Sequence, residues 1–535
     1  MEGKRSTIAS LNGIVAAAHP LAAQAGTRVM AAGGNAFDAA AAVAAALNVV
    51  EPYMSGLAGM GMATCYVARE RRVRTLDFVP RVPRKFPTGR FSARAELKRG
   101  AQGAGTPGNL AGWCELVLAY GTKPLAEALA PAIGLARDGF PIVEYGVVEI
   151  DEVAAEIRPR AELFGPWAAL YTGGTGRAAL GQVLRQPALA RTLEAIASEG
   201  PGYLYGGPLG RALVDQAQRY DGCLTLDDLA DVKPTWLEPL RAGYRGLLVH
   251  TLPPPAEAFQ YLLTLRALDG VDFTKYERNG VEHLDTLYRT IRLGAGVRIA
   301  NNNPTPDTLA SLMGDDRVER LRARVRDGEP IEGQVEQSVV PQPVSVAEQH
   351  TTSFSIADRD GNAVCVTQSL GSPFGCAVVV PEHGVCLNNF LFWGEAAAGT
   401  RNQLAPGAPL ALPLAPSIAT RDGEPVLVLG TPGSYGICQT QAQVMVQHLD
   451  YGLSLQEAIE EPRARLWDGR RVLIEQRIAP ATIDALRARG HEVDVGPPWE
   501  KMLVGGMQGI VRNPATGVLA GACDLRRDGY VAPVP

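Results

Sequence analysis

The chain has 535 residues, more than one hydrophobic core usually organises, so we expect either two lobes or one large layered domain. Hydrophobic residues make up 46% and charged residues 20% of the sequence, which excludes a disordered or fibrous protein. The formal net charge of −5 argues against nucleic acid or an anionic membrane as a partner. Local basic runs, including Arg526-Arg527, are expected to lie on the solvated surface.

The beginning of the chain and its cysteines indicate a cellular location. Residues 1–7 are polar and no uninterrupted apolar segment follows, so we expect no signal peptide, and the longest nearly apolar run, 39–50, is too short to span a bilayer. The 8 cysteines are scattered without a Cys-x-x-Cys pair, which favours reduced thiols in a cytoplasmic protein. The histidines include no His-Glu-x-x-His motif, and we expect neither a metal nor another cofactor.

The first half of the chain predicts alternating helices and strands. Residues 21–51 read as two helices broken at Gly33-Gly34-Asn35, with Asn35 as the N-cap of a buried, alanine-rich second helix. The other predicted elements are strands at 63–67, 73–79 and 244–252, a helix at 123–137, and a helix after the N-cap Thr225.

The composition changes near residue 326. Residues 326–350 are rich in Gln, Glu, Pro and Val without a clean period and read as a linker. The sequence from 351 onward predicts a compact α/β unit of its own, with strands at 351–356, 363–370, 425–429 and 472–475 and a helix at 481–489.

Hydroxyl side chains gather at the start of the first of these strands. If Asp360-Gly361 form a two-residue turn, Ser369 faces Thr352 and neighbours Thr351. The pattern also fits an ordinary threonine-rich edge strand.

A glycine-rich turn, 430–436, follows the apolar strand at 425–429. Such a turn can aim successive backbone N–H groups outward, as an oxyanion hole requires. Pro432 stands where a Gly-x-Ser-x-Gly nucleophile elbow needs glycine, and the Gly-Lys-Ser/Thr ending of a phosphate loop is missing. A purely structural turn is the alternative interpretation.

Motifs in one order along nearly the whole chain resemble those of the γ-glutamyltransferase family. The matching stretches are His19, Gly33-Gly34-Asn35-Ala36-x-Asp38-Ala39-Ala40, Glu51-Pro52-x-x-Ser55-Gly56, Gly105-x-Pro107-Gly108 with Gly112, Tyr120-Gly121-Thr122, Leu129-Ala130-Pro131-Ala132, Tyr244-Arg245-Gly246, Pro253-Pro254-Pro255, Thr351-Thr352-x-x-Ser355, Asp360-Gly361-Asn362-Ala363-Val364, Leu387-Asn388-Asn389 and Pro432-Gly433.

The resemblance implies an N-terminal-nucleophile hydrolase with an α+β, four-layer αββα sandwich. It also implies self-cleavage before Thr351, which leaves residues 1–350 and 351–535 as two associated subunits. Thr351 is then the nucleophile, its freed α-amino group (unperturbed pKa about 7.7–8.0) is the base, and Ser369 contacts the nucleophile. The backbone N–H groups of Gly433 and Ser434 are expected to hold the oxyanion.

The sequence departs from the family where the family grips the γ-glutamyl group. Apolar residues or glycine stand at the positions of its carboxylate- and amine-binding side chains, namely Val79, Gly371, Phe390, Trp393, Leu412 and Pro413. A zwitterionic head in such a pocket would leave charges unpaired, at a cost of roughly several kcal/mol. The substrate is therefore expected to be a small-molecule amide other than glutathione.

The resemblance leaves the acyl group open. Family members that lack these carboxylate- and amine-binding side chains (the γ-glutamyl clamp) include cephalosporin acylase-like and oxamate amidohydrolase-like enzymes. Phe390 and Trp393 are candidates to line an acyl pocket and Tyr435 to face it, with core packing as the alternative; Arg81 or Arg84 is a candidate to reach a small carboxylate, with surface solvation as the alternative. Two other functions stay open: a true γ-glutamyltransferase with a rebuilt clamp, and a non-catalytic relative that binds a ligand.

Overall fold

The computed structural model describes residues 5–327, 350–396, 399, 402–467, 469–501 and 503–535. Within these ranges no helix is both long enough and apolar enough to cross a membrane. Most of the predicted linker, residues 328–349, lies outside the described residues; Arg326 ends a helix and His350 begins a strand.

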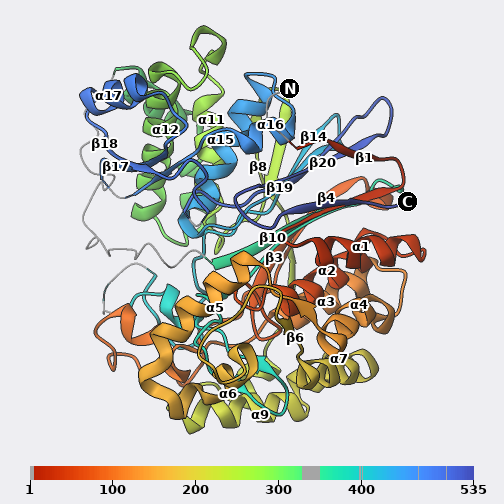
Figure 1. Ribbon diagram of the computed structural model, residues 1–535. Helices are drawn as coiled ribbons and strands as arrows, with labels where there is room; N and C mark the ends of the chain where they lie inside the picture. Colours follow the sequence, from red (N-terminus) through yellow and green to blue (C-terminus); the bar gives the residue numbers. More distant parts are fainter. Residues whose placement is uncertain (1–4, 328–349, 397–398, 400–401, 468, 502) are drawn as a thin grey trace.

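Two antiparallel sheets lie face to face in the middle of the molecule (Figure 1). Sheet A has the order β1 (Ile8–Ser10), β20 (Leu519–Cys523), β19 (Gln508–Arg512), β15 (Glu424–Gly430), β14 (Ser417–Arg421), β9 (Leu247–Thr251), β8 (Leu240–Tyr244). Sheet B has the order β21 (Tyr530–Pro533), β2 (Gly13–Ala17), β10 (His350–Asp358), β11 (Ala363–Gly371), β3 (Met60–Val67), β4 (Arg72–Asp77), β7 (Thr235–Leu237).

Helices cover the outer face of each sheet, which gives the four layers (Figure 1). On the sheet B side lie α1 (Pro20–Ala31), α2 (Ala36–Val50), α3 (Asn109–Tyr120), α4 (Leu125–Asp138), α5 (Glu144–Ile157), α6 (Ala161–Thr172), α7 (Pro187–Glu199) and α9 (Pro208–Arg219). On the sheet A side lie α11 (Phe259–Leu268), α12 (Val281–Ala300), α15 (Ile437–Leu449), α16 (Leu455–Glu460) and α17 (Pro480–Ala488). The predicted αββα sandwich is confirmed.

The remaining helices and strands complete the fold. They are the helices α8 (Gly202–Tyr205), α10 (Leu226–Ala230), α13 (Pro306–Leu312) and α14 (Asp315–Arg326), and the strands β5 (Phe140–Pro141), β6 (Val183–Leu184), β12 (Val379–Val380), β13 (Val385–Cys386), β16 (Ala464–Leu466), β17 (Arg471–Glu475) and β18 (Glu492–Gly496).

The second N-terminal helix, α2, is built as predicted. The Asn35 side chain accepts from the N–H groups of Phe37 and Asp38, and Asp38 accepts from Asn35 N in return, which completes a capping box. Asp38 also accepts from Thr122 N and Thr122 Oγ1, so this motif is fastened to the Tyr120-Gly121-Thr122 stretch. The small side chains of α2 are buried throughout and support β10 and β11.

Two predicted strands have different bounds. The strand predicted at 244–252 is the β8–β9 hairpin, because Arg245 (φ 50°) and Gly246 (φ 74°) form a turn after Tyr244. The strand predicted at 73–79 ends at Asp77, whose carboxylate accepts from Val79 N and turns the chain out of the sheet.

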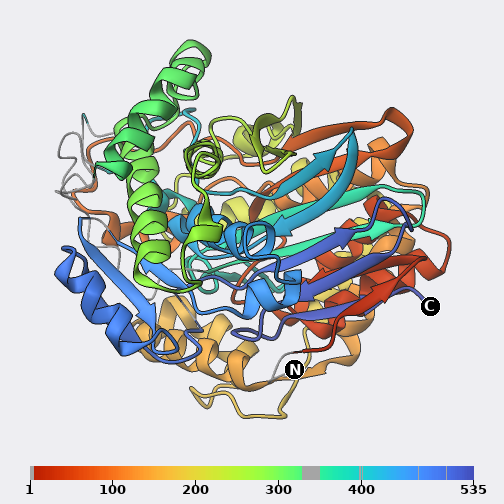
Figure 2. The ribbon, with the colours of Figure 1, turned by 90° about the horizontal axis from the view of Figure 1, so that it is seen from above.

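The interpretation of residues 351–535 as a unit of its own was wrong. β10 pairs with β2, β11 with β3, and β14 with β9, so both sheets combine strands from the two sides of residue 350. Figure 2 shows red N-terminal strands beside blue C-terminal ones, where β1 pairs with β20 and β2 with β21. If either segment formed its sheets alone, the strands that now pair with the other segment would be left as unpaired edges. Pairing between the segments removes these edges.

The β10–β11 hairpin has a three-residue loop, Arg359 to Gly361, instead of the predicted two-residue turn. Asp358 N donates to Asn362 O, and Gly361 takes the left-handed conformation (φ 88°). Thr352 is therefore paired with Gln368, and the predicted pairing of Thr352 with Ser369 was wrong by one residue. A register shift between His350 and Thr352 leaves Ser369 across from Thr351.

The two sheets approach closely where β15 ends. A Cβ atom on Gly430 would lie 2.0 Å from Ser353 Oγ and 2.9 Å from Cys365 Sγ. Cys365 Sγ donates to Leu429 O (3.1 Å), and Ser355 Oγ donates to Gln508 O (3.2 Å). Small polar side chains thus replace the usual thick apolar layer and bring the end of β15 directly onto β10.

We expect Gly430→Ala to destabilise the protein by about 1–3 kcal/mol, because the new methyl group overlaps Ser353 Oγ. The melting temperature checks this. Gly243→Ala is the matched control, since Gly243 is exposed in β8 of the same sheet and no atom lies within 4 Å of the place that an added methyl group would take. Ser353→Ala should restore part of the loss; equal melting temperatures for the two glycine variants would contradict the packing argument.

Candidate active site

The hydroxyl groups of Thr351 and Ser369 meet at the carbonyl oxygen of His350. Thr351 Oγ1 lies 2.8 Å from His350 O and 3.4 Å from Ser369 Oγ, and Ser369 Oγ donates to His350 O (2.9 Å). Gly371 N donates to Ser369 Oγ (2.8 Å) and fixes its position. All three residues are buried. The Thr351 hydroxyl and the His350 carbonyl that accepts from Ser369 therefore share one buried spot.

The glycine-rich turn lies on the same side of β10 as Thr351. Gly430 of β15 packs directly against Ser353 of β10. Thr351 lies two residues before Ser353 in β10, and side chains two residues apart in a strand point to the same face. The turn continues from Gly430 beyond the sheet, with Gly433 (φ 129°) and Ser434 (φ 54°) both at positive φ before α15 begins. Ser434 Oγ is buried with no hydrogen-bond partner in the described part of the chain. Backbone held at positive φ and a buried hydroxyl without a hydrogen-bond partner are both common at binding sites.

Two of the aromatic residues predicted to bind substrate, Trp393 and Tyr435, lie close to each other. The Trp393 and Tyr435 rings are 6.4 Å apart, and the Arg298 guanidinium lies 4.3 Å from the Tyr435 ring centroid. Trp393 Nε1 is buried and has no hydrogen-bond partner among the described residues. Phe390, beside Gly105, and Trp393 both belong to one buried apolar cluster, against which Tyr435 packs.

The structure leaves no space for a side chain at Gly371, one of the positions where the sequence departs from the family that it resembles. A Cβ atom on Gly371 (φ 103°) would lie 2.2 Å from Asn389 Oδ1 and 3.2 Å from Trp393 Nε1. Asn389 is held by Ser372, whose N–H donates to it, and by Lys98, whose carbonyl accepts from it. The space of the missing side chain is thus filled by a fixed amide and an indole.

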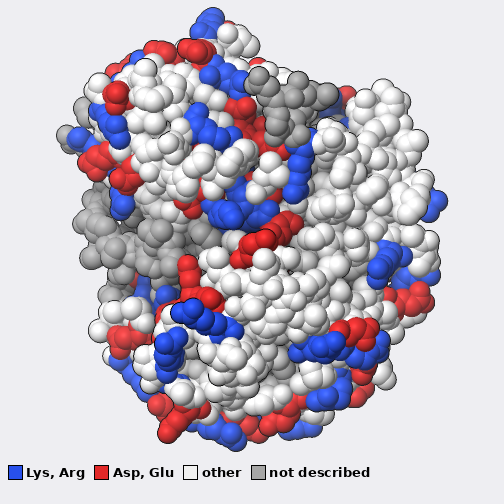
Figure 3. Space-filling view, viewed as in Figure 1, with Lys and Arg blue, Asp and Glu red and all other residues white. Residues whose placement is uncertain are grey.

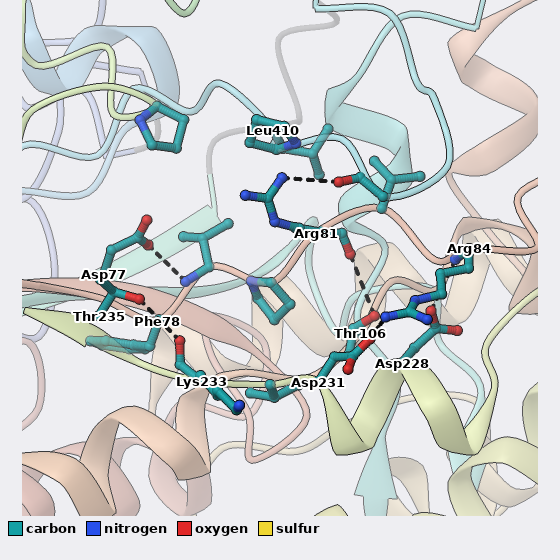
Figure 4. A pocket seen from close by; sticks show the side chains of 17 residues that line it. Asp77, Phe78, Arg81, Arg84, Thr106, Asp228, Asp231, Lys233, Thr235 and Leu410 are labelled. Atoms are coloured by element: carbon teal, nitrogen blue, oxygen red, sulfur yellow. Dashed lines mark hydrogen bonds and ion pairs between the residues drawn. The ribbon is translucent and has the colours of Figure 1, made fainter.

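Arg81 lines a cavity of about 450 Å³ at the end of β4 (Figure 4). Its walls include Val79, Leu410 and Asp77, and Arg81 Nη1 donates to Gly407 O (3.0 Å). Burial raises the pKa of Asp77 to about 6, against the opposing effects of its hydrogen bond from Val79 N and of the charge on Arg81. Arg84, the other candidate, is ion-paired with Asp231.

This cavity and Thr351 lie at the same edge of sheet B. Ser369 of β11 pairs with Met60 of β3, and Met62 of β3 pairs with Asp77 at the end of β4. A line drawn across the sheet from Thr351 to the cavity therefore crosses the strands β10, β11, β3 and β4 in that order. Neighbouring strands are about 4.8 Å apart, which puts the cavity roughly 14 Å from Thr351.

Buried charged residues flank β10 on its helix side, and none of them was assigned a role from the sequence. Glu51 accepts from Thr352 Oγ1 (2.8 Å), Glu149 lies 2.9 Å from His350 Nε2, and Arg527 Nη1 donates to Thr351 O (3.4 Å). Burial raises the pKa of Glu51 to about 7. Glu51 belongs to a family motif, but Glu149 carries no local sequence signal.

The expectation that Arg526-Arg527 are solvated was wrong. Arg526 is fully buried, with Nη2 2.6 Å from Glu475 Oε2 and Nη1 3.1 Å from Asp524 Oδ1, and Asp524 also pairs with Arg463. Buried guanidinium groups require such partners, which come from distant parts of the chain. This network holds the segment that carries Arg527 against β10.

On the face shown in Figure 3, acidic and basic side chains are interspersed rather than gathered by sign. Across the residues with described positions, no group of three or more His, Cys, Asp or Glu side chains is arranged to hold a metal ion.

Comparison with known proteins places these features in context. Residues 22–534 match the family model described as gamma-glutamyltranspeptidase. The chain is 34% identical to the Acylase ACY 1 proenzyme of Pseudomonas sp. (strain SE83), covering 97% of this chain and 92% of that protein. It is 30% identical to the glutathione hydrolase proenzyme of Bacillus subtilis (strain 168), covering 97% and 91%. The structure of a cephalosporin acylase from Bacillus halodurans superposes with a TM-score of 0.89 at 29% identity, covering 100% and 98%.

We expect stability to depend on pH through Glu51. Its folded pKa of about 7 exceeds the ordinary value of 4.5, so the unfolded state releases a proton between these pH values and the folded state does not. Stability therefore falls as pH rises from 4.5 to 7, and Glu51→Gln should remove a penalty of roughly 3 kcal/mol. The melting temperature of Glu51→Gln relative to its parent, both carrying Thr351→Ala, should rise between pH 4.5 and 8. The exposed control Glu199→Gln should show no such trend; a flat difference for Glu51→Gln would contradict the argument.

Proposed function

This chain belongs to the gamma-glutamyltranspeptidase family, and we propose that it cuts itself before Thr351 and then hydrolyses a small-molecule amide whose acyl group is not γ-glutamyl. As a member of this family it is an N-terminal-nucleophile hydrolase that cleaves amide C–N bonds. The observation that carries the proposal is the meeting of Thr351 Oγ1 and Ser369 Oγ at the His350 carbonyl.

In the self-cleavage, Thr351 Oγ1 attacks the carbonyl carbon of His350. Ser369 supports this step, because its hydroxyl already donates to the oxygen on which negative charge develops. The amide becomes an ester, and water then releases the His350 carboxylate. Residues 1–350 and 351–535 stay together, because strands of both segments pair in each sheet.

In the reaction with substrate, the freed α-amino group of Thr351 takes the proton of Oγ1 as the hydroxyl attacks. The N–H groups of Gly433 and Ser434 hold the oxyanion, which is consistent with the position of their turn above β10. The amine leaves, and water cleaves the acyl-enzyme.

The chemical nature of the acyl group is inferred from the residues at the positions where the family binds the γ-glutamyl carboxylate and amine. Asn389 and Trp393 fill the space beside Gly371, and Val79 opens onto the cavity that contains Arg81. We propose an acyl group that is apolar near the amide and carries a carboxylate at its far end, bound by Arg81. Trp393 Nε1 and Ser434 Oγ supply hydrogen-bonding groups without other partners in the described chain. Similarity to an acylase proenzyme and to a cephalosporin acylase structure supports this over a γ-glutamyl substrate.

No cofactor or second protein takes part in the proposed reaction. All of the cysteines are free thiols, which supports the cytoplasmic location that we propose.

Freshly purified protein should yield fragments of about 37 and 20 kDa from the 56.7 kDa chain, the smaller one beginning Thr-Thr-Ser-Phe-Ser. Thr351→Ala should remain uncut, because it lacks the attacking hydroxyl, and Thr351→Ser should be cut. Intact-mass analysis and N-terminal sequencing measure this. A wild-type chain that stays whole, or a Thr351→Ala chain that is cut at the same bond, would refute the assignment of the nucleophile.

The acyl preference can be tested with p-nitroanilides of γ-glutamate, of a simple fatty acid and of a dicarboxylic acid. We expect turnover of the dicarboxylic half-amide to exceed that of the γ-glutamyl compound. Arg81→Ala should raise KM for the half-amide by about 10- to 100-fold with little change in kcat, because one charge-assisted hydrogen bond is lost from binding. Arg84→Ala, in the same cavity but paired with Asp231, is the control. Preference for the γ-glutamyl compound would instead support a rebuilt clamp.

A further inference from the structure

A buried threonine lies at the start of the glycine-rich turn that follows β15. Thr431 has 0% exposure, and its hydroxyl donates to the carbonyl oxygen of Pro432 (2.9 Å), the residue before Gly433. The same hydroxyl oxygen accepts from Gly506 N (3.3 Å), which is far along the chain. The Thr431 hydroxyl therefore joins the turn to a second segment of the backbone.

The second segment, residues 503–507, leads into β19. It lies beside the turn because Gly430, the last residue of β15, pairs with Gln508, the first residue of β19. A Cβ atom on Gly505 (φ 82°) would lie only 2.7 Å from Thr431 Oγ1. Glycine is the residue that combines this left-handed backbone with so close an approach. The turn and the second segment are therefore in direct contact.

Buried charges hold the second segment in place. Arg463 Nη2 donates to Gly505 O (3.2 Å) and is ion-paired with Asp524. Asp524 also accepts from Met507 N (3.1 Å). Burial raises the pKa of Asp524, but the charges of Arg463 and Arg526 more than offset this effect and lower the pKa to about 2, so the carboxylate is ionised. Movement of either partner would leave a buried charge unpaired, and the segment is fixed as a result.

The second segment also contacts the residue that holds the proposed nucleophile. A Cβ atom on Gly506 would lie 2.6 Å from Cδ of Arg527, so the stem of the arginine packs against this glycine. Arg527 Nη1 donates to the carbonyl oxygen of Thr351 (3.4 Å). Contacts thus run without a gap from Thr431 in the turn, through residues 505–506, to the backbone of Thr351.

The conformation of the turn requires support from its surroundings. Gly433 (φ 129°) and Ser434 (φ 54°) both have positive φ, which is energetically costly for serine and persists only where neighbouring structure enforces it. Gly436 N donates to Gly433 O (2.9 Å) and closes the turn at its far end. The Thr431 hydroxyl fixes the near end, where the chain leaves β15.

We propose that Thr431 is a positioning residue for the proposed hydrolysis, an inference that rests on the proposed function. Its hydroxyl ties the turn to residues 505–507 and so fixes the N–H groups of Gly433 and Ser434 relative to Thr351. Donors aimed at a developing oxyanion stabilise the transition state only when they are held in place before the reaction. Thr431 therefore affects the rate of the chemical step rather than the affinity for substrate.

The test measures release of p-nitroaniline from the dicarboxylic half-amide, with rates expressed per cut subunit. Thr431→Val should lower kcat by about 10- to 100-fold with little change in KM, because a displacement of about 1 Å near the reacting atoms costs rate on this order. Thr431→Ser keeps the hydroxyl and should restore most of kcat. Thr172→Val is the matched control and should keep the wild-type kcat, since the Thr172 hydroxyl is also buried, donates to Ala168 O (2.6 Å) and accepts from Gly176 N (3.2 Å), but lies in α6.

A pair of glycine variants tests the same contact without a change at Thr431. Gly505→Ala places a methyl group 2.7 Å from Thr431 Oγ1, so it should displace the turn and lower kcat in the same way. Gly517→Ala is its control, because Gly517 (φ 75°) has a similar left-handed backbone but no atom within 4 Å of the added methyl group. Melting temperatures show whether each variant is folded, and the glycine pair decides the question if Thr431→Val is not.

Three results would overturn the inference. They are a wild-type kcat in folded Thr431→Val, a rise in KM alone, and equal kcat values in Gly505→Ala and Gly517→Ala. A folded Thr431→Val chain that stays uncut would also overturn it, because self-cleavage is expected to need Ser369, which already donates to His350 O, and not the turn. A wild-type chain that is never cut, or that is cut but releases no p-nitroaniline from any of the three substrates, would instead refute the proposed function.

Discussion

The two sheets touch most closely where Gly430 of β15 rests on Ser353 of β10, and the arrangement of the site depends on that contact. Only a residue without a side chain permits this approach, and only short polar side chains fit beneath it. The contact sets the height of the turn that follows β15 above Thr351. A thicker apolar layer between the sheets would lift Gly433 and Ser434 away from the carbonyl that they are proposed to polarise.

The alternation of side chains along β10 divides two kinds of chemistry between the faces of one strand. Thr351 points toward sheet A, where the turn and the indole of Trp393 surround the space proposed for substrate. His350 and Thr352 point toward the helices, where Glu149 and Glu51 receive them. Successive residues of this strand therefore face the space proposed for substrate and a buried set of ionisable side chains in turn.

The features that were predictable from the sequence are those whose partners are close in the chain. The capping box of Asn35 and Asp38 spans one helical turn, and the β10–β11 hairpin spans one loop. The register of that hairpin was missed by one residue, because Asp358 pairs with Asn362 and lengthens the loop. The partner of Arg526, Glu475, is distant in the sequence, and no local pattern near Arg526 indicates it. The buried ion-pair network was therefore interpreted from the sequence as a solvated basic run.

Both sheets combine strands from before and after residue 350. For a chain divided there, folding and unfolding are no longer the reverse of each other, because recovery of the native state would require two separate polypeptides to find one another and interleave. The working lifetime of such an enzyme is set by its unfolding rate rather than by its equilibrium stability. The single covalent chain is then a temporary folding aid, and its loss leaves a kinetically trapped product that cannot be renewed once it has opened.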